Sequence, residues 1–194
     1  MDVFVKDVRD KCREHGIRFY ASKGKYLRLS SNIRAGGYFD DVTKTLAYAK
    51  GHSMALSLLA HESCHLDQFV EAPEMWANAD QLPILDEWLS GKNFPKEKIR
   101  KCIEAAIALE LDCEKRTVEK IKKYNLPIDI KKYIKQANTY LFFYLWLENT
   151  RRWSSPNNSP YKNEEIIAAA PSRFLTDYSV IPDKIVSLFA KYKI

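Results

Sequence analysis

The spacing of apolar and polar residues in the first fifty residues differs from the spacing in the rest of the chain. Residues 3–15 place apolar side chains at helical spacing and stop before Gly16, a favourable residue just past a helix end. Short segments rich in aromatic and β-branched residues follow, with turn-like sequences between them. They predict four strands, IRFYA, KYLRLS, GYFDD and KTLAYA, which we expect to form a small antiparallel or mixed sheet.

From residue 53 onward the apolar residues recur every three or four positions, as on one face of a helix. This spacing predicts helices at about 53–71, 82–90, 95–124 and 128–149. After the loop RRWSSPNNSPYKN, the segments EEIIAAA and PDKIVSLFAKYK predict two short closing helices. The fold class is therefore expected to be α+β, with a small N-terminal sheet packed on a mostly helical body.

The length of 194 residues suits a single domain, 1–194, with one core. Within it we expect three parts: a helix and sheet at 1–50, a helical core with the candidate site at 53–149, and a C-terminal loop with short helices at 150–194. The longest apolar run, TYLFFYLWL, is too short to cross a membrane, and the first residues do not resemble a secretory signal. We therefore expect no membrane partner.

Charge and cysteine content narrow the class of protein further. The net charge of +6 comes from lysine-rich stretches in which acidic residues are interleaved, without a motif that reads DNA or RNA. We expect solvated helix faces and no specific nucleic-acid partner. The four cysteines contain no C-x-x-C pair, which favours free, buried thiols and a reducing, cytoplasmic compartment.

The segment LLAHESCHLDQF, residues 58–69, carries the chemistry that the sequence offers most clearly. His61 and His65 are four positions apart, so on a helix both lie on one face and can direct a ring nitrogen at one cation. Glu62 projects beside the pair, where a general base of a zinc hydrolase would be. The alternative is two core histidines satisfied by hydrogen bonds, since this pattern occurs by chance in roughly one per cent of chains of this length.

A catalytic zinc ion needs three protein ligands and one open position. No histidine follows residue 65, so the third ligand must be a carboxylate or a cysteine. On the helix expected at 95–124, Glu110 is central to the apolar face and Glu114 lies about 40° away, whereas Asp112 lies near 200°, toward solvent. Cys64, inside the histidine motif, is expected to point into the core.

Two carboxylates on an apolar face need cations, because burying them unpaired costs several kcal/mol. A zinc ion would neutralise Glu110, and the ring N–H of a histidine ligand would donate to Glu114. The alternative is that both glutamates pair with lysine or arginine from a neighbouring helix.

The motif HESCH followed by ELDCE resembles the gluzincin metallopeptidases, in which H-E-x-x-H is completed by a glutamate on a second helix. Their second motif commonly reads E-x-x-A-D or E-x-x-A-N. Glu110 matches the ligand, Cys113 stands at the position of the alanine, and Glu114 replaces the aspartate or asparagine. The order of elements over roughly 38–125 also resembles minimal intracellular zincins of the ImmA/IrrE kind, which cleave repressor proteins. The resemblance implies a zincin-like fold.

These observations predict a zinc metalloendopeptidase with one Zn²⁺ per chain, held by His61, His65 and Glu110, and with Glu62 as the general base. The substrate is a peptide or protein, which we expect to add a strand along TLAYA as the sheet edge. A regulatory protein partner is also compatible with the resemblance. The alternative function is a catalytically inactive zincin-like module that binds a protein or a nucleic acid.

An oxyanion needs one more hydrogen-bond donor than the metal site supplies. We predict Tyr161, because it lies in a loop that can close over a substrate. Tyr144, Arg151 and Arg152 are the alternatives that the sequence leaves open.

Overall fold

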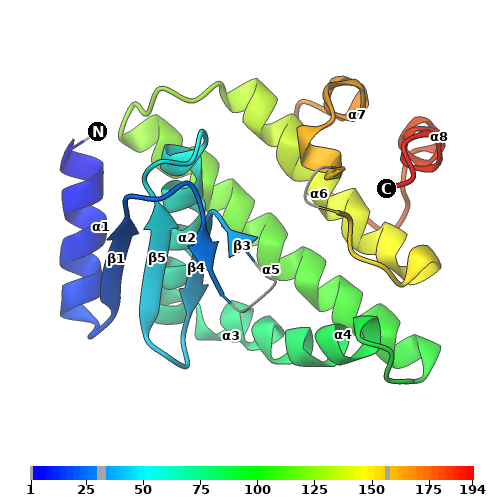
Figure 1. Ribbon diagram of the computed structural model, residues 1–194, viewed down its shortest axis with the longest axis horizontal. Helices are drawn as coiled ribbons and strands as arrows, with labels where there is room; N and C mark the ends of the chain where they lie inside the picture. The colour runs from blue at the N-terminus through cyan, green and yellow to red at the C-terminus, as the bar shows by residue number, and fades with distance from the viewer. Residues whose placement is uncertain (1, 30–33, 156–157) are drawn as a thin grey trace. The chain divides into compact units, whose positions relative to one another are not determined.

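The computed structural model describes residues 2–29, 34–155 and 158–194 and has an α+β fold (Figure 1). Its helices are α1 (Asp2–Glu14), α2 (Ala55–Glu71), α3 (Pro73–Trp76), α4 (Leu82–Leu89), α5 (Lys96–Lys123), α6 (Ile130–Thr150), α7 (Glu164–Ala169) and α8 (Asp183–Lys191), with 3₁₀ turns η1 (Ala77–Gln81) and η2 (Pro160–Lys162). Its strands are β1 (Arg18–Ser22), β2 (Leu27–Arg28), β3 (Arg34–Ala35), β4 (Gly37–Asp40) and β5 (Thr45–Ala49). Among the described residues, no helix is both long and apolar enough to cross a membrane.

The chain divides into two compact units. Unit 1 comprises Met1–Trp76 and Cys113–Ile128, and unit 2 comprises Ala77–Asp112 and Asp129–Ile194. The division passes through α5, which is one continuous helix across this point. The number of domains stays a prediction.

The sheet of unit 1 is mixed. β5 pairs in parallel with β1 on one side and antiparallel with β4 on the other, so the strand order is β1-β5-β4. The prediction that TLAYA is the edge strand is therefore wrong. All five of its residues are buried, and a short run without charges is typical of a strand covered on both faces. Within the described part of the chain, β4 is an edge of this sheet.

Helix α2 packs on β4 and β5, and α1 packs against β1 (Figure 1). The helix approaches β4 closely because two glycines, Gly36 and Gly37, leave room for it. A Cβ atom on Gly36 would clash with the Leu58 side chain, and one on Gly37 would lie 2.9 Å from Cγ of Glu62. β2 and β3 form a separate antiparallel pair. The end of the predicted strand KYLRLS, residue 30, lies outside the described residues.

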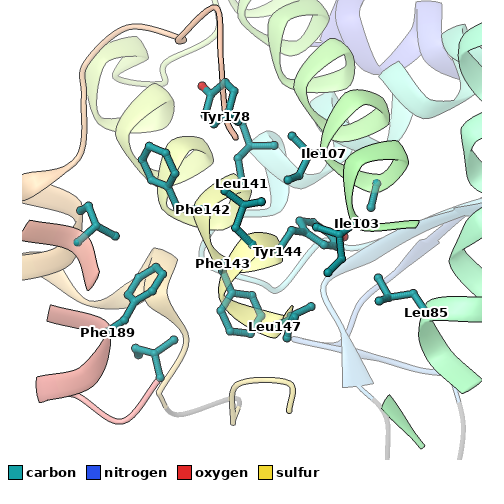
Figure 2. Close-up of a cluster of buried hydrophobic side chains, with 14 of the residues drawn as sticks. Leu85, Ile103, Ile107, Leu141, Phe142, Phe143, Tyr144, Leu147, Tyr178 and Phe189 are labelled. Atoms are coloured by element: carbon teal, nitrogen blue, oxygen red, sulfur yellow. The ribbon is translucent and has the colours of Figure 1, made fainter. Parts of the chain in front are cut away.

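Unit 2 is built around α6, whose apolar run is mostly buried (Figure 2). Phe142, Phe143 and Tyr144 of this helix belong to a core cluster that also contains residues of α4, α5 and α8. The indole N–H of Trp146 donates to the backbone oxygen of Ile194 at 2.9 Å, which fixes the chain end against α6. TYLFFYLWL is thus largely a core segment of unit 2.

Candidate metal centre

His61 and His65 lie one turn apart on α2 with their Nε2 atoms 3.1 Å from each other. Their rings meet edge to face, with centroids 4.7 Å apart. Two imidazole nitrogens bound at about 2.0–2.1 Å to one tetrahedral zinc ion lie roughly 3.3 Å apart. The pair is therefore spaced as two ligands of one cation.

Gln68 orients His65, and the sequence had not singled it out. Its side-chain oxygen, fully buried, lies 2.8 Å from Nδ1 of His65. An amide oxygen only accepts, so Nδ1 carries the proton and Nε2 keeps its lone pair for the site. Burial, with the nearby His61, lowers the pKa of His65 to about 3. His65 is thus neutral at physiological pH, which is the form that binds a metal.

Glu114 of α5 lies on the other side of His61, with its Oε1 atom 3.4 Å from Nδ1 of that histidine. This is the neighbourhood that the sequence predicted for it. Glu114 is buried, and its Oε2 atom has no hydrogen-bond partner within the described part of the chain. A buried carboxylate oxygen in this position is costly unless positive charge lies close by. The donor set therefore fits a bound cation.

Glu62 faces β4 from the same turn of α2 and is buried. A hydrogen bond from the backbone of Phe39 reaches its carboxylate. Burial raises the pKa of Glu62, while His61 and the Phe39 hydrogen bond act in the opposite direction. A carboxylate with a raised pKa, held against a strand edge, is suited to accept and release a proton.

Cys113 also lies beside the histidine pair, a position that its place in the second motif had not predicted. Its thiol is fully buried and lies 3.5 Å from Nδ1 and 4.0 Å from Nε2 of His61. Donor atoms of His61, His65 and Cys113 all lie within 4.8 Å of one another, which makes them a group able to hold a metal ion. The available signal was its spacing of three from Glu110, which places it within about 60° of the centre of the predicted face.

Glu110 lies one turn before Glu114 on α5, in the part of the helix that belongs to unit 2. Both glutamates are buried, as expected for the apolar face, whereas Asp112, which was expected to face solvent, is half-buried. In unit 2, the pKa values of Tyr140 and Tyr144 are raised well above the usual value. The main cause is burial of the two tyrosines, and the charge of Glu110 acts in the same direction. The role of Glu110 as the third ligand stays a prediction.

Tyr161 lies in η2 of unit 2, where its ring is 5.7 Å from that of Tyr140. Its backbone oxygen accepts a hydrogen bond from the Gln136 side chain. Of the alternative donors, Tyr144 shares a hydrogen bond with Tyr140, and Arg151 donates to the backbone oxygen of Trp88. Their role toward an oxyanion stays a prediction.

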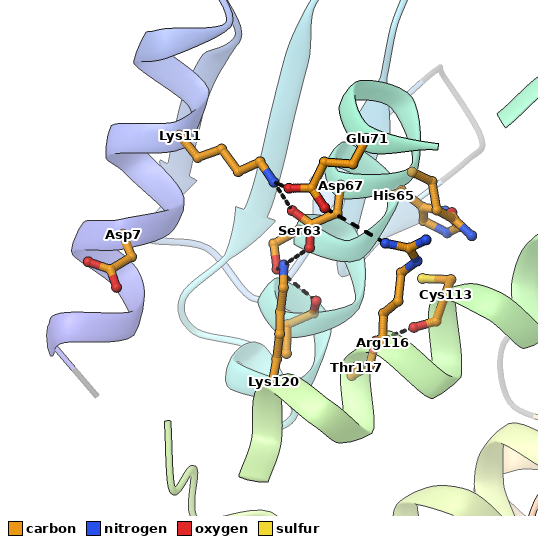
Figure 3. Close-up of polar contacts among 12 residues, drawn as sticks. Asp7, Lys11, Ser63, His65, Asp67, Glu71, Cys113, Arg116, Thr117 and Lys120 are labelled. Atoms are coloured by element: carbon orange, nitrogen blue, oxygen red, sulfur yellow. Dashed lines mark hydrogen bonds and ion pairs between the residues drawn. The ribbon is translucent and has the colours of Figure 1, made fainter. Parts of the chain in front are cut away.

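On the face of α2 that points away from the histidine pair, acidic side chains form ion pairs with neighbouring helices (Figure 3). Asp67 lies 2.6 Å from the ammonium of Lys11 on α1 and 2.7 Å from that of Lys120 on α5. Lys120 also donates to the hydroxyl of Ser63. Glu71, one turn beyond Asp67, pairs with Lys11 and with Arg116. These contacts hold α2 between its neighbours and so set the direction of the histidine pair.

Comparisons of the chain with protein-family models, with curated proteins and with solved structures found no match.

Proposed function

We propose that the protein is a zinc-dependent metalloendopeptidase. The observation that carries this proposal is the 3.1 Å separation of the two Nε2 atoms of His61 and His65, with the Glu62 carboxylate buried on the same helix against a strand edge. Two imidazoles at this spacing need only a further ligand to make a catalytic zinc site with an open position.

We propose Glu110 as that third ligand and Glu114 as the carboxylate that orients His61. Because α5 is continuous, Glu110 lies on the same face as Glu114, one turn earlier. When bound, zinc lowers the pKa of a water molecule toward neutrality and polarises the scissile carbonyl. The donor set, with imidazole and carboxylate groups, suits this metal.

The chain's own residues would carry the proton and hold the substrate. Glu62 takes the proton of the attacking water and passes it to the leaving amine. The substrate is a peptide or protein segment that adds a strand to the sheet. Because β5 is central, the strand for this purpose is β4, the edge next to Glu62.

The proposal has three further parts, which concern the oxyanion, the compartment and the partners. Tyr161 supplies the additional donor to the oxyanion. Among the described residues the four cysteines form no disulfide, which supports a reducing, cytoplasmic compartment. A regulatory protein partner is compatible with a small peptidase, whereas a specific nucleic-acid partner and a membrane partner are not part of the proposal.

The substitution Glu62→Gln tests this function. We expect it to keep the metal and to lower hydrolysis of unstructured proteins by about 10²- to 10⁴-fold, because it removes the base without touching a ligand. Zinc retention would be measured by chelator competition. Glu97→Gln, on the exposed start of α5, is the matched control and should behave as wild type.

Two outcomes would contradict the proposal. Unchanged hydrolysis by Glu62→Gln would remove the glutamate from the reaction. A wild-type protein that binds zinc but cleaves no unstructured substrate would favour the alternative, a zincin-like module that binds a partner.

A further inference from the structure

Cys113 lies on the side of α5 that faces His65 of α2 (Figure 3), and its thiol is also close to His61. It donates a hydrogen bond to the backbone oxygen of His61 at 3.4 Å and is 3.5 Å from Nδ1 of the same residue. The residue is fully buried, and it lies in the same compact unit as both histidines. The site therefore has a sulfur donor beside its two nitrogen donors.

The distances suit a shared metal ion. A thiolate at about 2.3 Å and an imidazole nitrogen at about 2.0–2.1 Å from one tetrahedral zinc ion lie roughly 3.5 Å apart. The sulfur of Cys113 is 4.0 Å from Nε2 of His61, so a small rotation about χ1 of the cysteine brings it into the ligand shell. Cys64, also buried, does not belong to this group of donors.

We infer that Cys113 is a ligand of the metal held by His61 and His65, an inference that rests on the proposed metal site. On binding, the thiol proton leaves to solvent as the sulfur–metal bond forms, and the hydrogen bond to the His61 backbone is given up. Two imidazoles and one thiolate then make a three-ligand set within unit 1. A soft thiolate donor favours zinc, cobalt or cadmium over magnesium or manganese.

Cys113 ties the affinity of the site for its metal to a reduced thiol, because only the deprotonated thiol of a cysteine is a metal ligand.

Cobalt substitution tests the inference on the full chain. We expect Co²⁺, added to metal-free reduced protein, to give visible d–d bands and a near-ultraviolet thiolate-to-cobalt charge-transfer band. The substitution Cys113→Ala should abolish the charge-transfer band while keeping the visible bands. Cys12→Ala is the matched control, because it removes a buried thiol of the same unit from α1, and it should keep both bands. Cys64 does not serve as the control, because its thiol shares a hydrogen bond with that of Cys113.

If Cys113→Ala does not fold, the wild-type spectrum with Cys12→Ala, Cys64→Ala and Cys102→Ala still decides the matter. A band that survives in each of these variants belongs to Cys113. Visible cobalt bands without a charge-transfer band in the wild type would overturn the thiolate ligand and leave the proposed peptidase intact. No cobalt bands at all would overturn the metal site, and with it both proposals.

Discussion

Gly37 sets how closely β4 approaches the Glu62 side chain. A Cβ atom at this position would lie 2.9 Å from Cγ and 3.3 Å from Oε1 of Glu62. We expect Gly37→Ala to displace the carboxylate and lower hydrolysis about tenfold or more with unchanged zinc content, because small misplacements of a catalytic group are costly. Gly24→Ala is the control, since its Cβ atom meets no atom closer than 3.4 Å. If Gly37→Ala hydrolyses substrate at the wild-type rate, the close approach of β4 to Glu62 is not needed for hydrolysis.

Single residues differ in how far the sequence could predict them. The spacing of His61 and His65 is enough to place both on one face, because helical geometry is local. The burial of Glu114 follows from the angle on its own helix. Gln68 and Cys113 could not be predicted in this way, because their contacts with the histidines depend on ring orientation and on how α5 meets α2.

At the scale of elements, α2 is held by the ion pairs of Asp67 on its side away from β4. Asp67→Asn leaves the ammonium groups of Lys11 and Lys120 without their shared carboxylate in a partly buried place. We expect the free energy of unfolding to fall by about 3 kcal/mol, measured by urea denaturation. Asp10→Asn removes an exposed partner of Lys6 and should change little. Equal stability of the two variants would mean that the charges around Asp67 do not anchor the helix.

The long helices and the two short closing helices, α7 and α8, were predictable from the sequence pattern, whereas the short turns beside α2, α4 and α6 were not. The helices expected at 53–71, 82–90, 95–124 and 128–149 agree with α2, α4, α5 and α6 within one or two residues at their ends. α3, η1 and η2 are too short to produce a period. β5 is central because it pairs with β1 as well as with β4, and β1 lies some 27 residues earlier in the sequence. The segment TLAYA has no charged residue, and this is compatible both with a peptide-binding edge strand and with a buried central strand.

At the scale of the molecule, residues far apart in the sequence meet in unit 1. His61, Glu62 and His65 come from α2, and Cys113 and Glu114 come from the later half of α5. Glu110 and Tyr161 belong to unit 2. Hydrophobic patterning predicted the α+β class, but the division into two units was not visible in it, because the boundary runs through the uninterrupted helix α5.

The zinc content of freshly purified protein tests the central claim most directly. We expect close to one zinc ion per chain in the wild type and in Asp112→Asn, and a strong loss in Glu110→Gln, because a neutral amide is a much poorer ligand than a carboxylate. Less than about a tenth of an equivalent in the wild type, unchanged after incubation with zinc under reducing conditions, would contradict the account.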